Sequence, residues 1–226
     1  MRSGNRLDPG MYLRSFPLLF RHLSIVTAPL LAAVVAVLLD QLSAFTTDPV
    51  GGVGSGIYAW IAQVVYLMAF GVATIQARDV WRGYKGTFDD AWGEAKHKIG
   101  TIAMGAIGFT FLVSFAGTLG AFVHLSILLV LVVAFLLIYT MPAAAIGGAP
   151  AGFAIQASYR AAIAHPWATA LLAIAYVVCT TFVPMLLSPL YAGLPDIVVK
   201  LIGAAVTALL LAYLAFPFAK QYQDVA

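Results

Sequence analysis

Residues 99–146 read IGTIAMGAIGFTFLVSFAGTLGAFVHLSILLVLVVAFLLIYTMPAAAI and contain no Asp, Glu, Lys or Arg. A helix needs about 20 apolar residues to cross about 30 Å of hydrocarbon, so these 48 residues are too many for one span and suit a hairpin of two. The one break in the run is Gly117-Thr118-Leu119-Gly120. The stretch therefore predicts spans over 99–121 and 122–146.

The rest of the chain has the same apolar character. Of the 226 residues, 62% are hydrophobic and 9% are charged, against about 25% charged in a soluble domain. The length criterion gives four more spans, over 23–45, 56–77, 167–190 and 195–218. The sequence therefore predicts an all-α polytopic membrane bundle of six helices, forming a single transmembrane domain over 1–226. Soluble enzymes and secreted disulfide scaffolds are excluded, and the only cysteine, Cys179, lies inside a span.

Basic residues fix the expected orientation. With six spans, one side of the membrane receives eleven of the twelve basic residues, namely Arg2, Arg6, Arg14, Arg21, Arg78, Arg82, Lys85, Lys96, Lys98, Arg160 and Lys220. The positive-inside rule places this side, with both termini, in the cytoplasm. The net charge of +3 then indicates membrane lipids, and not nucleic acid, as partners.

Three short amphipathic helices are expected at the cytoplasmic interface, over 11–22, 87–98 and 153–165. Their apolar residues recur at helical spacing, as Tyr12, Phe16, Leu19 and Leu23, then Phe88, Trp92, Ala95 and Ile99, then Ile155, Tyr159 and Ala162. Contact with lipid headgroups is expected from Arg14, Arg21, Trp92, Lys96, Lys98 and Arg160. In the second helix, Thr87 and Asp90 fit an N-terminal cap, while Glu94 and Lys98 have the i,i+4 spacing of an ion pair.

Each short helix precedes two spans, so the chain has a possible threefold helix-span-span repeat. Aligning the stripes and aligning His22, His97 and His165 need shifts that differ by one residue. The layout resembles bacterial six-span inner-membrane proteins, the YciC-like proteins and the membrane domain of glycerophosphoryl diester phosphodiesterases. The resemblance rests on the segments 14–31, 82–95 and 141–160. It implies an envelope or lipid-associated role, without the phosphodiesterase activity, whose catalytic domain has no counterpart here.

The histidines are the candidate ligands. His22, His97 and His165 have similar expected depths and are weak candidates for a metal site. His124, near the opposite face at the start of span four, could hold a haem or a pigment. Histidine also suits the headgroup region, so the sequence predicts no cofactor and no metal.

The remaining polar and small residues favour structural roles. Asp196 and Lys200 are spaced i,i+4 at the start of span six, as expected of a helix start with a snorkelling lysine. Close helix approach in span three is expected from Gly100, Gly105, Gly108, Gly117 and Gly120. The sequence contains no HExxH and no Ser-His-Asp set to support an intramembrane enzyme.

Three functions remain open. The favoured one is a non-catalytic membrane protein, either a lipid-associated envelope module or an accessory subunit of a larger membrane complex, with other subunits or a second copy as partners. The second is a small oligomeric transporter or channel, which is weakened because the span centres contain no ionisable carboxylate or amine. The third is a pigment- or haem-holding subunit that uses His124.

Overall fold

The computed structural model describes residues 8–45, 53–148, 150, 152–191 and 193–226. Within this part of the chain all regular structure is helical, and six helical segments are long and apolar enough to span a membrane. The prediction of an all-α bundle with six spans is confirmed. In chain order the segments are α2 (Thr27–Phe45), α3 (Val53–Trp81), α5 (Ile99–Phe122), α6 (Ser126–Leu136) with α7 (Thr140–Ile146), α9 (Pro166–Val177) with α10 (Val183–Leu187), and α11 (Asp196–Val225).

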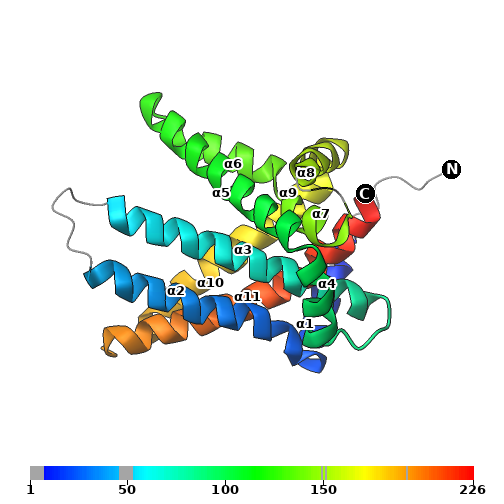
Figure 1. Ribbon diagram of the computed structural model, residues 1–226, viewed down its shortest axis with the longest axis horizontal. Helices are drawn as coiled ribbons and strands as arrows, with labels where there is room; N and C mark the ends of the chain where they lie inside the picture. The colour runs from blue at the N-terminus through cyan, green and yellow to red at the C-terminus, as the bar shows by residue number, and fades with distance from the viewer. Residues whose placement is uncertain (1–7, 46–52, 149, 151, 192) are drawn as a thin grey trace.

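Three short helices lie across one end of these spans (Figure 1). They are α1 (Gly10–Arg21), α4 (Phe88–His97) and α8 (Phe153–Ala164), and each agrees with its predicted range to within one residue at either end. The last turns of α3, α7 and α11 meet at this end, which we call the basic end, after Arg14, Arg82, Lys96, Arg160 and Lys220. The opposite, far end has the turns near Asp40, His124 and Asp196. Arg2 and Arg6, which the charge count included, lie outside the described residues.

The junction between short helix and span supports the repeat. His22 ends α1 with φ −129° and ψ 56°, and His165 ends α8 with φ −131° and ψ 61°. We call each short helix with the two spans that follow it a unit. In the second unit the residue between α4 and α5 is Lys98, with φ −110° and ψ 9°. The structural junction is therefore one residue beyond His97. This displacement accounts for the two alignment shifts in the sequence.

The core lies at the basic end, where the second span of each unit is most deeply buried. Continuous buried runs cover 69–78 in α3, 139–145 around α7, and 214–219 in α11. Toward the far end, the α5–α6 hairpin diverges from the α2–α3 pair (Figure 1). The bundle is thus held together mainly at one end.

A buried hydrogen-bond network joins the three units in this core. The Tyr139 hydroxyl accepts from Gln221 Nε2 at 3.0 Å and from Thr169 Oγ1 at 3.3 Å. The Tyr12 hydroxyl donates to Gln221 Oε1 at 3.4 Å. Because buried polar groups need partners, these contacts fix how the second and third units sit on α1.

Span four is broken, where the sequence predicted one continuous helix over 122–146. The chain leaves the helix after Leu136 and restarts at Thr140. Pro142 is the physical reason, because proline fits only the first turn of a helix and its ring clashes with the carbonyl four residues earlier. The Ser158 hydroxyl from α8 bridges the break, accepting from the Tyr139 N–H and donating to the Leu136 carbonyl, each at 3.0 Å.

Span five is also irregular. A π-helical segment over Val178–Phe182 separates α9 from α10, whose second position is Pro184. The proline lacks the N–H that would continue the α-helical pattern, so the widened turn follows from its position. Only 6% of the most apolar 18-residue stretch of this span is buried in the bundle, against 22–39% in the other five spans.

The α5–α6 hairpin turns at 123–125, a few residues after the predicted break at 117–120. Gly120 permits this turn, because a Cβ there would lie 2.3 Å from Ser126 Cα. Gly105, Gly108 and Gly117 also face neighbouring side chains. Gly100 does not, since a Cβ there would meet no atom within 4 Å, so the packing role predicted for it is wrong.

Candidate functional site

The three short helices at the basic end share one buried register. Relative to the junctions His22, Lys98 and His165, the positions three and seven residues earlier are buried in every unit. The residues at these positions are Leu19 and Ser15, Ala95 and Ala91, and Ala162 and Ser158. Each short helix is therefore fixed to the bundle by a narrow face of mostly small side chains.

Several large apolar residues of these helices point away from the bundle. Phe16 and Leu23 of the first predicted stripe are exposed, as are Trp92 of the second and Tyr159 of the third. The predicted stripes are thus divided between two surroundings. Leu19, Ala95 and Ala162 face the core, and Tyr12 and Phe88 pack partly against it. The reason is that lipid is as apolar as a protein core, so apolar periodicity alone does not tell one from the other.

Aromatic and basic side chains share this outer surface. Phe16 and Phe20 form an edge-to-face pair, with ring centroids 5.0 Å apart. Phe88 and Trp92 stack, and the Lys96 ammonium lies 5.8 Å from the centre of the Trp92 ring. The guanidinium-bearing residues Arg14, Arg21 and Arg160 are exposed on α1 and α8, and Arg14 pairs with the Asp8 carboxylate. We call this set the outer basic surface: Arg14, Phe16, Phe20, Arg21, Trp92, Lys96, Tyr159 and Arg160.

An ion-pair network at the basic end holds α4 against α3. The Arg78 guanidinium donates to both Glu94 carboxylate oxygens, at 2.8 Å and 2.6 Å, and its Nε donates to Asp79 at 2.9 Å. Lys98 Nζ donates to Glu94 Oε1 at 2.7 Å and to the Ala145 carbonyl at 3.0 Å, which reaches the end of α7. The predicted Glu94–Lys98 pair is confirmed, but the Lys98 ammonium is engaged within the protein. The predicted cap of α4 is confirmed too, because Asp90 N–H donates to Thr87 Oγ1 at 3.3 Å.

The network lowers the pKa of Glu94 to about 2, from a usual value of 4.5, chiefly because the Arg78 guanidinium donates to its carboxylate. A lowered pKa stabilises the fold above the usual value, and this contribution is lost as pH falls from about 4.5 toward 2. The pairing of Arg78 with Glu94 could not be predicted from the sequence, because Arg78 is buried at the end of a span and lies 16 residues from Glu94.

We expect Glu94→Gln to lower the free energy of unfolding by about 1–2 kcal/mol at pH 7, because it removes the negative charge and replaces one of the two oxygens that accept from Arg78 with an NH2 donor. The wild-type protein should also lose stability between pH 5 and pH 3, and the variant should lose much less. Denaturant unfolding in mild detergent at both pH values measures this. The control is Asp89→Asn, an exposed carboxylate on the same helix. Equal pH sensitivity of the wild type and Glu94→Gln would contradict the assignment.

The three interfacial histidines are not brought together. His22 and His165 end α1 and α8, and His22 Nδ1 lies 3.2 Å from the Lys85 carbonyl oxygen. Among the described residues, no group of three or more His, Cys, Asp or Glu side chains is placed to hold a metal ion. The weak metal candidacy of His22, His97 and His165 therefore receives no geometric support.

His124 forms the turn of the α5–α6 hairpin, where the sequence placed it at the start of span four. Its φ of +55° is left-handed, a conformation in which histidine is enriched among non-glycine residues. All residues of 121–125 are exposed. The surroundings of His124 thus provide no enclosing wall for a macrocycle in the described part of the chain.

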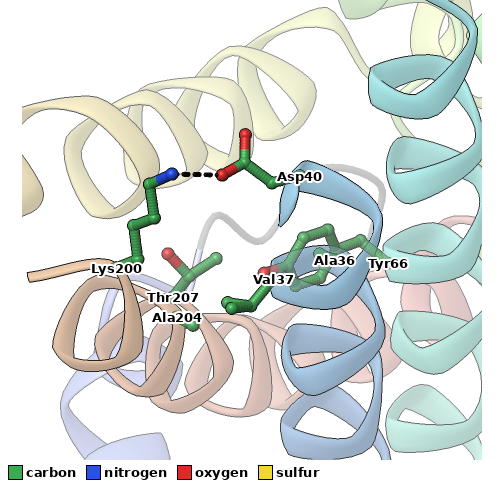
Figure 2. A pocket seen from close by; sticks show the side chains of 7 residues that line it. All are labelled: Ala36, Val37, Asp40, Tyr66, Lys200, Ala204 and Thr207. Carbon is green, nitrogen blue, oxygen red and sulfur yellow. Dashed lines mark hydrogen bonds and ion pairs between the residues drawn. The ribbon is translucent and has the colours of Figure 1, made fainter. Parts of the chain in front are cut away.

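At the far end, Lys200 pairs with a carboxylate of another span. Its Nζ lies 2.6 Å from Asp40 Oδ2, across from α11 to α2 (Figure 2). The predicted helix start is confirmed, because α11 begins at Asp196 after Pro195. Asp40 and Lys200 are 160 residues apart, so only the folded bundle brings them together.

Comparison of the chain with family models, curated proteins and solved structures gives no match.

Proposed function

We propose that this chain is a non-catalytic integral protein of the bacterial inner membrane, a lipid-associated envelope module with both termini in the cytoplasm. The observation that carries the proposal is the outer basic surface, where aromatic side chains and exposed cations alternate on three helices lying across the spans. Aromatic rings prefer the headgroup level, and cations beside them attract the anionic lipids of a cytoplasmic leaflet. The resemblance in layout to YciC-like membrane proteins supports the same role.

A second candidate function is an accessory subunit of a larger membrane complex. Span five favours it, because it buries the smallest share of its apolar window and exposes the Thr181 hydroxyl within the π-helical segment. Threonine side chains in spans often make hydrogen bonds to a neighbouring helix. A second span packed here would give Thr181 such a partner.

The lipid proposal predicts selective retention of anionic lipid. In nanodiscs containing phosphatidylcholine and phosphatidylglycerol, native mass spectrometry should find phosphatidylglycerol enriched on the protein. Changing Arg14, Arg21, Lys96 and Arg160 together to glutamine should remove most of this enrichment, since each cation contributes about 1 kcal/mol, or about fivefold, at an anionic surface. High salt should weaken it in the wild type.

The matched control is Lys220→Gln, because Lys220 is a cation at the same end that does not belong to the outer basic surface; its ammonium lies 2.8 Å from the Asp224 carboxylate. Unchanged enrichment in the fourfold variant would reject the outer basic surface as the lipid contact. A stoichiometric protein that co-purifies and is lost in Thr181→Trp would favour the accessory subunit instead.

A further inference from the structure

A hollow of about 290 Å³ opens at the far end of the bundle, between α2 and α11 (Figure 2). Its lining comes from three spans and consists of Ala36, Val37 and Asp40 of α2, Tyr66 of α3, and Lys200, Ala204 and Thr207 of α11. None of these residues belongs to the outer basic surface. The hollow is thus a separate feature, at the opposite end of the spans.

The charged rim of the hollow has unused bonding capacity. Lys200 Nζ and Asp40 Oδ2 are 2.6 Å apart, yet their side chains remain 43% and 54% exposed. An ammonium has three N–H donors and a carboxylate about four acceptor positions. Within the described residues, neither charged group has another hydrogen-bond or ion-pair partner. The second carboxylate oxygen of Asp40 points away from Lys200 (Figure 2). Both ions can therefore bind a further group without separating.

The depth of the rim is that of lipid headgroups. Lys200 is four residues from the start of α11, and Asp40 is three residues before the end of the apolar span Leu23–Ser43. At 1.5 Å per residue, each lies within about 6 Å of the end of its apolar span. Ala36 and Ala204 are one helical turn deeper on the same faces. The hollow therefore has a charged mouth at the interface and an apolar wall toward the membrane interior.

We propose that this hollow binds one phospholipid with a zwitterionic, primary-ammonium headgroup, of the phosphatidylethanolamine class. Its phosphate accepts hydrogen bonds from Lys200, and its ammonium donates to the free oxygen of Asp40. A choline headgroup carries no N–H and cannot make the second contact. An anionic headgroup meets the Asp40 carboxylate, which repels it. The first acyl segments lie against Ala36, Val37 and Ala204.

This inference builds on the proposal of a lipid-associated module, but its site and headgroup differ from those of the outer basic surface. A free zwitterion with the same phosphate and ammonium would satisfy the rim alone. The apolar wall below the rim favours the lipid, because acyl chains can pack against it, whereas the free zwitterion has no apolar group to do so. The two sources are separated by the test.

The test uses the full chain in nanodiscs of equal phosphatidylethanolamine and phosphatidylcholine, with bound lipid counted by native mass spectrometry. We expect the wild type to retain one phosphatidylethanolamine and to prefer it over phosphatidylcholine by about tenfold, as a charge-assisted hydrogen bond predicts. Asp40→Asn should reduce this preference to about one. Asp196→Asn, a carboxylate at the same end that does not line the hollow, should leave it unchanged.

Ala204→Phe provides a second variant, because it fills the apolar part and keeps the ion pair. We expect it to abolish retention of the lipid. Equal retention of both lipids by the wild type, or full retention by Asp40→Asn and Ala204→Phe, would overturn the proposal. Displacement of the bound lipid by millimolar glycerophosphoethanolamine would overturn its lipid source and assign the rim to a free solute. None of these outcomes changes phosphatidylglycerol enrichment at the outer basic surface, so the two proposals fail separately.

Discussion

Gly120→Ala is expected to open the α5–α6 hairpin and to destabilise the protein by about 3 kcal/mol or more. The alanine Cβ would lie 2.3 Å from Ser126 Cα and 2.7 Å from Ser126 N, and both atoms belong to the backbone. A flexible side chain could rotate away from such a contact, whereas here α6 itself must move. The measurement is the midpoint of thermal unfolding in mild detergent, together with the yield of monodisperse protein.

Gly100→Ala is the matched control in the same helix, because its Cβ would meet no atom within 4 Å. Gly105→Leu should be intermediate, since the Ala144 Cβ lies 3.2 Å from the position of the added Cβ. Gly108→Leu should cost less, because its nearest neighbour is the flexible end of Ile155. Equal unfolding midpoints for Gly100→Ala and Gly120→Ala would show that α5 and α6 do not approach as closely as described.

The ranking of these glycines shows what the sequence could predict. A run of small residues indicates close helix approach somewhere along span three, and four of the five glycines do meet a neighbour. The pattern does not say which neighbour, because that depends on the turn at 123–125 and on the helices packed behind α5. Gly100 belongs to the same run and faces open space.

The number of spans and the positions of the short helices were predictable because both depend on local composition. Which face of each helix points inward was not predictable, because a phenylalanine that faces outward and one that faces the core both have apolar neighbours in the sequence. Phe16 is exposed while Phe216 is fully buried. Small residues were the better signal, because Ala91 and Ala95 mark the buried face of α4.

The ion pairs at the two ends of the bundle could not be predicted from the sequence for a different reason. Arg78 binds Glu94 across a turn, and Lys200 binds Asp40 across 160 residues, so neither pair has a local spacing rule. The break in span four did have a signal that could have been used. Pro142 lies within the predicted helix, and proline in a helix interior predicts an interruption just before it.

Ser158→Ala is expected to lower the free energy of unfolding by about 2 kcal/mol or more, because it leaves the Tyr139 N–H and the Leu136 carbonyl without their partner at the break in span four. Ser15→Ala is the matched control, at the same position of the first unit and equally buried. The Ser15 hydroxyl donates at 2.7 Å to the Met11 carbonyl, which α1 already uses in its own hydrogen bonding. Its removal should cost about 0.6 kcal/mol, the average for side-chain hydrogen bonds in membrane bundles.

Denaturant unfolding of the two variants in the same detergent measures the difference. Hydrogen exchange at the Tyr139 amide tests the cause directly, since this N–H should lose protection in Ser158→Ala and keep it in Ser15→Ala. If the two serines cost the same, the hydroxyl of Ser158 does not hold the broken helix, and packing of α8 against α7 must do so. If Tyr139 alone loses protection, the Ser158 side chain of α8 holds the broken fourth span at this point.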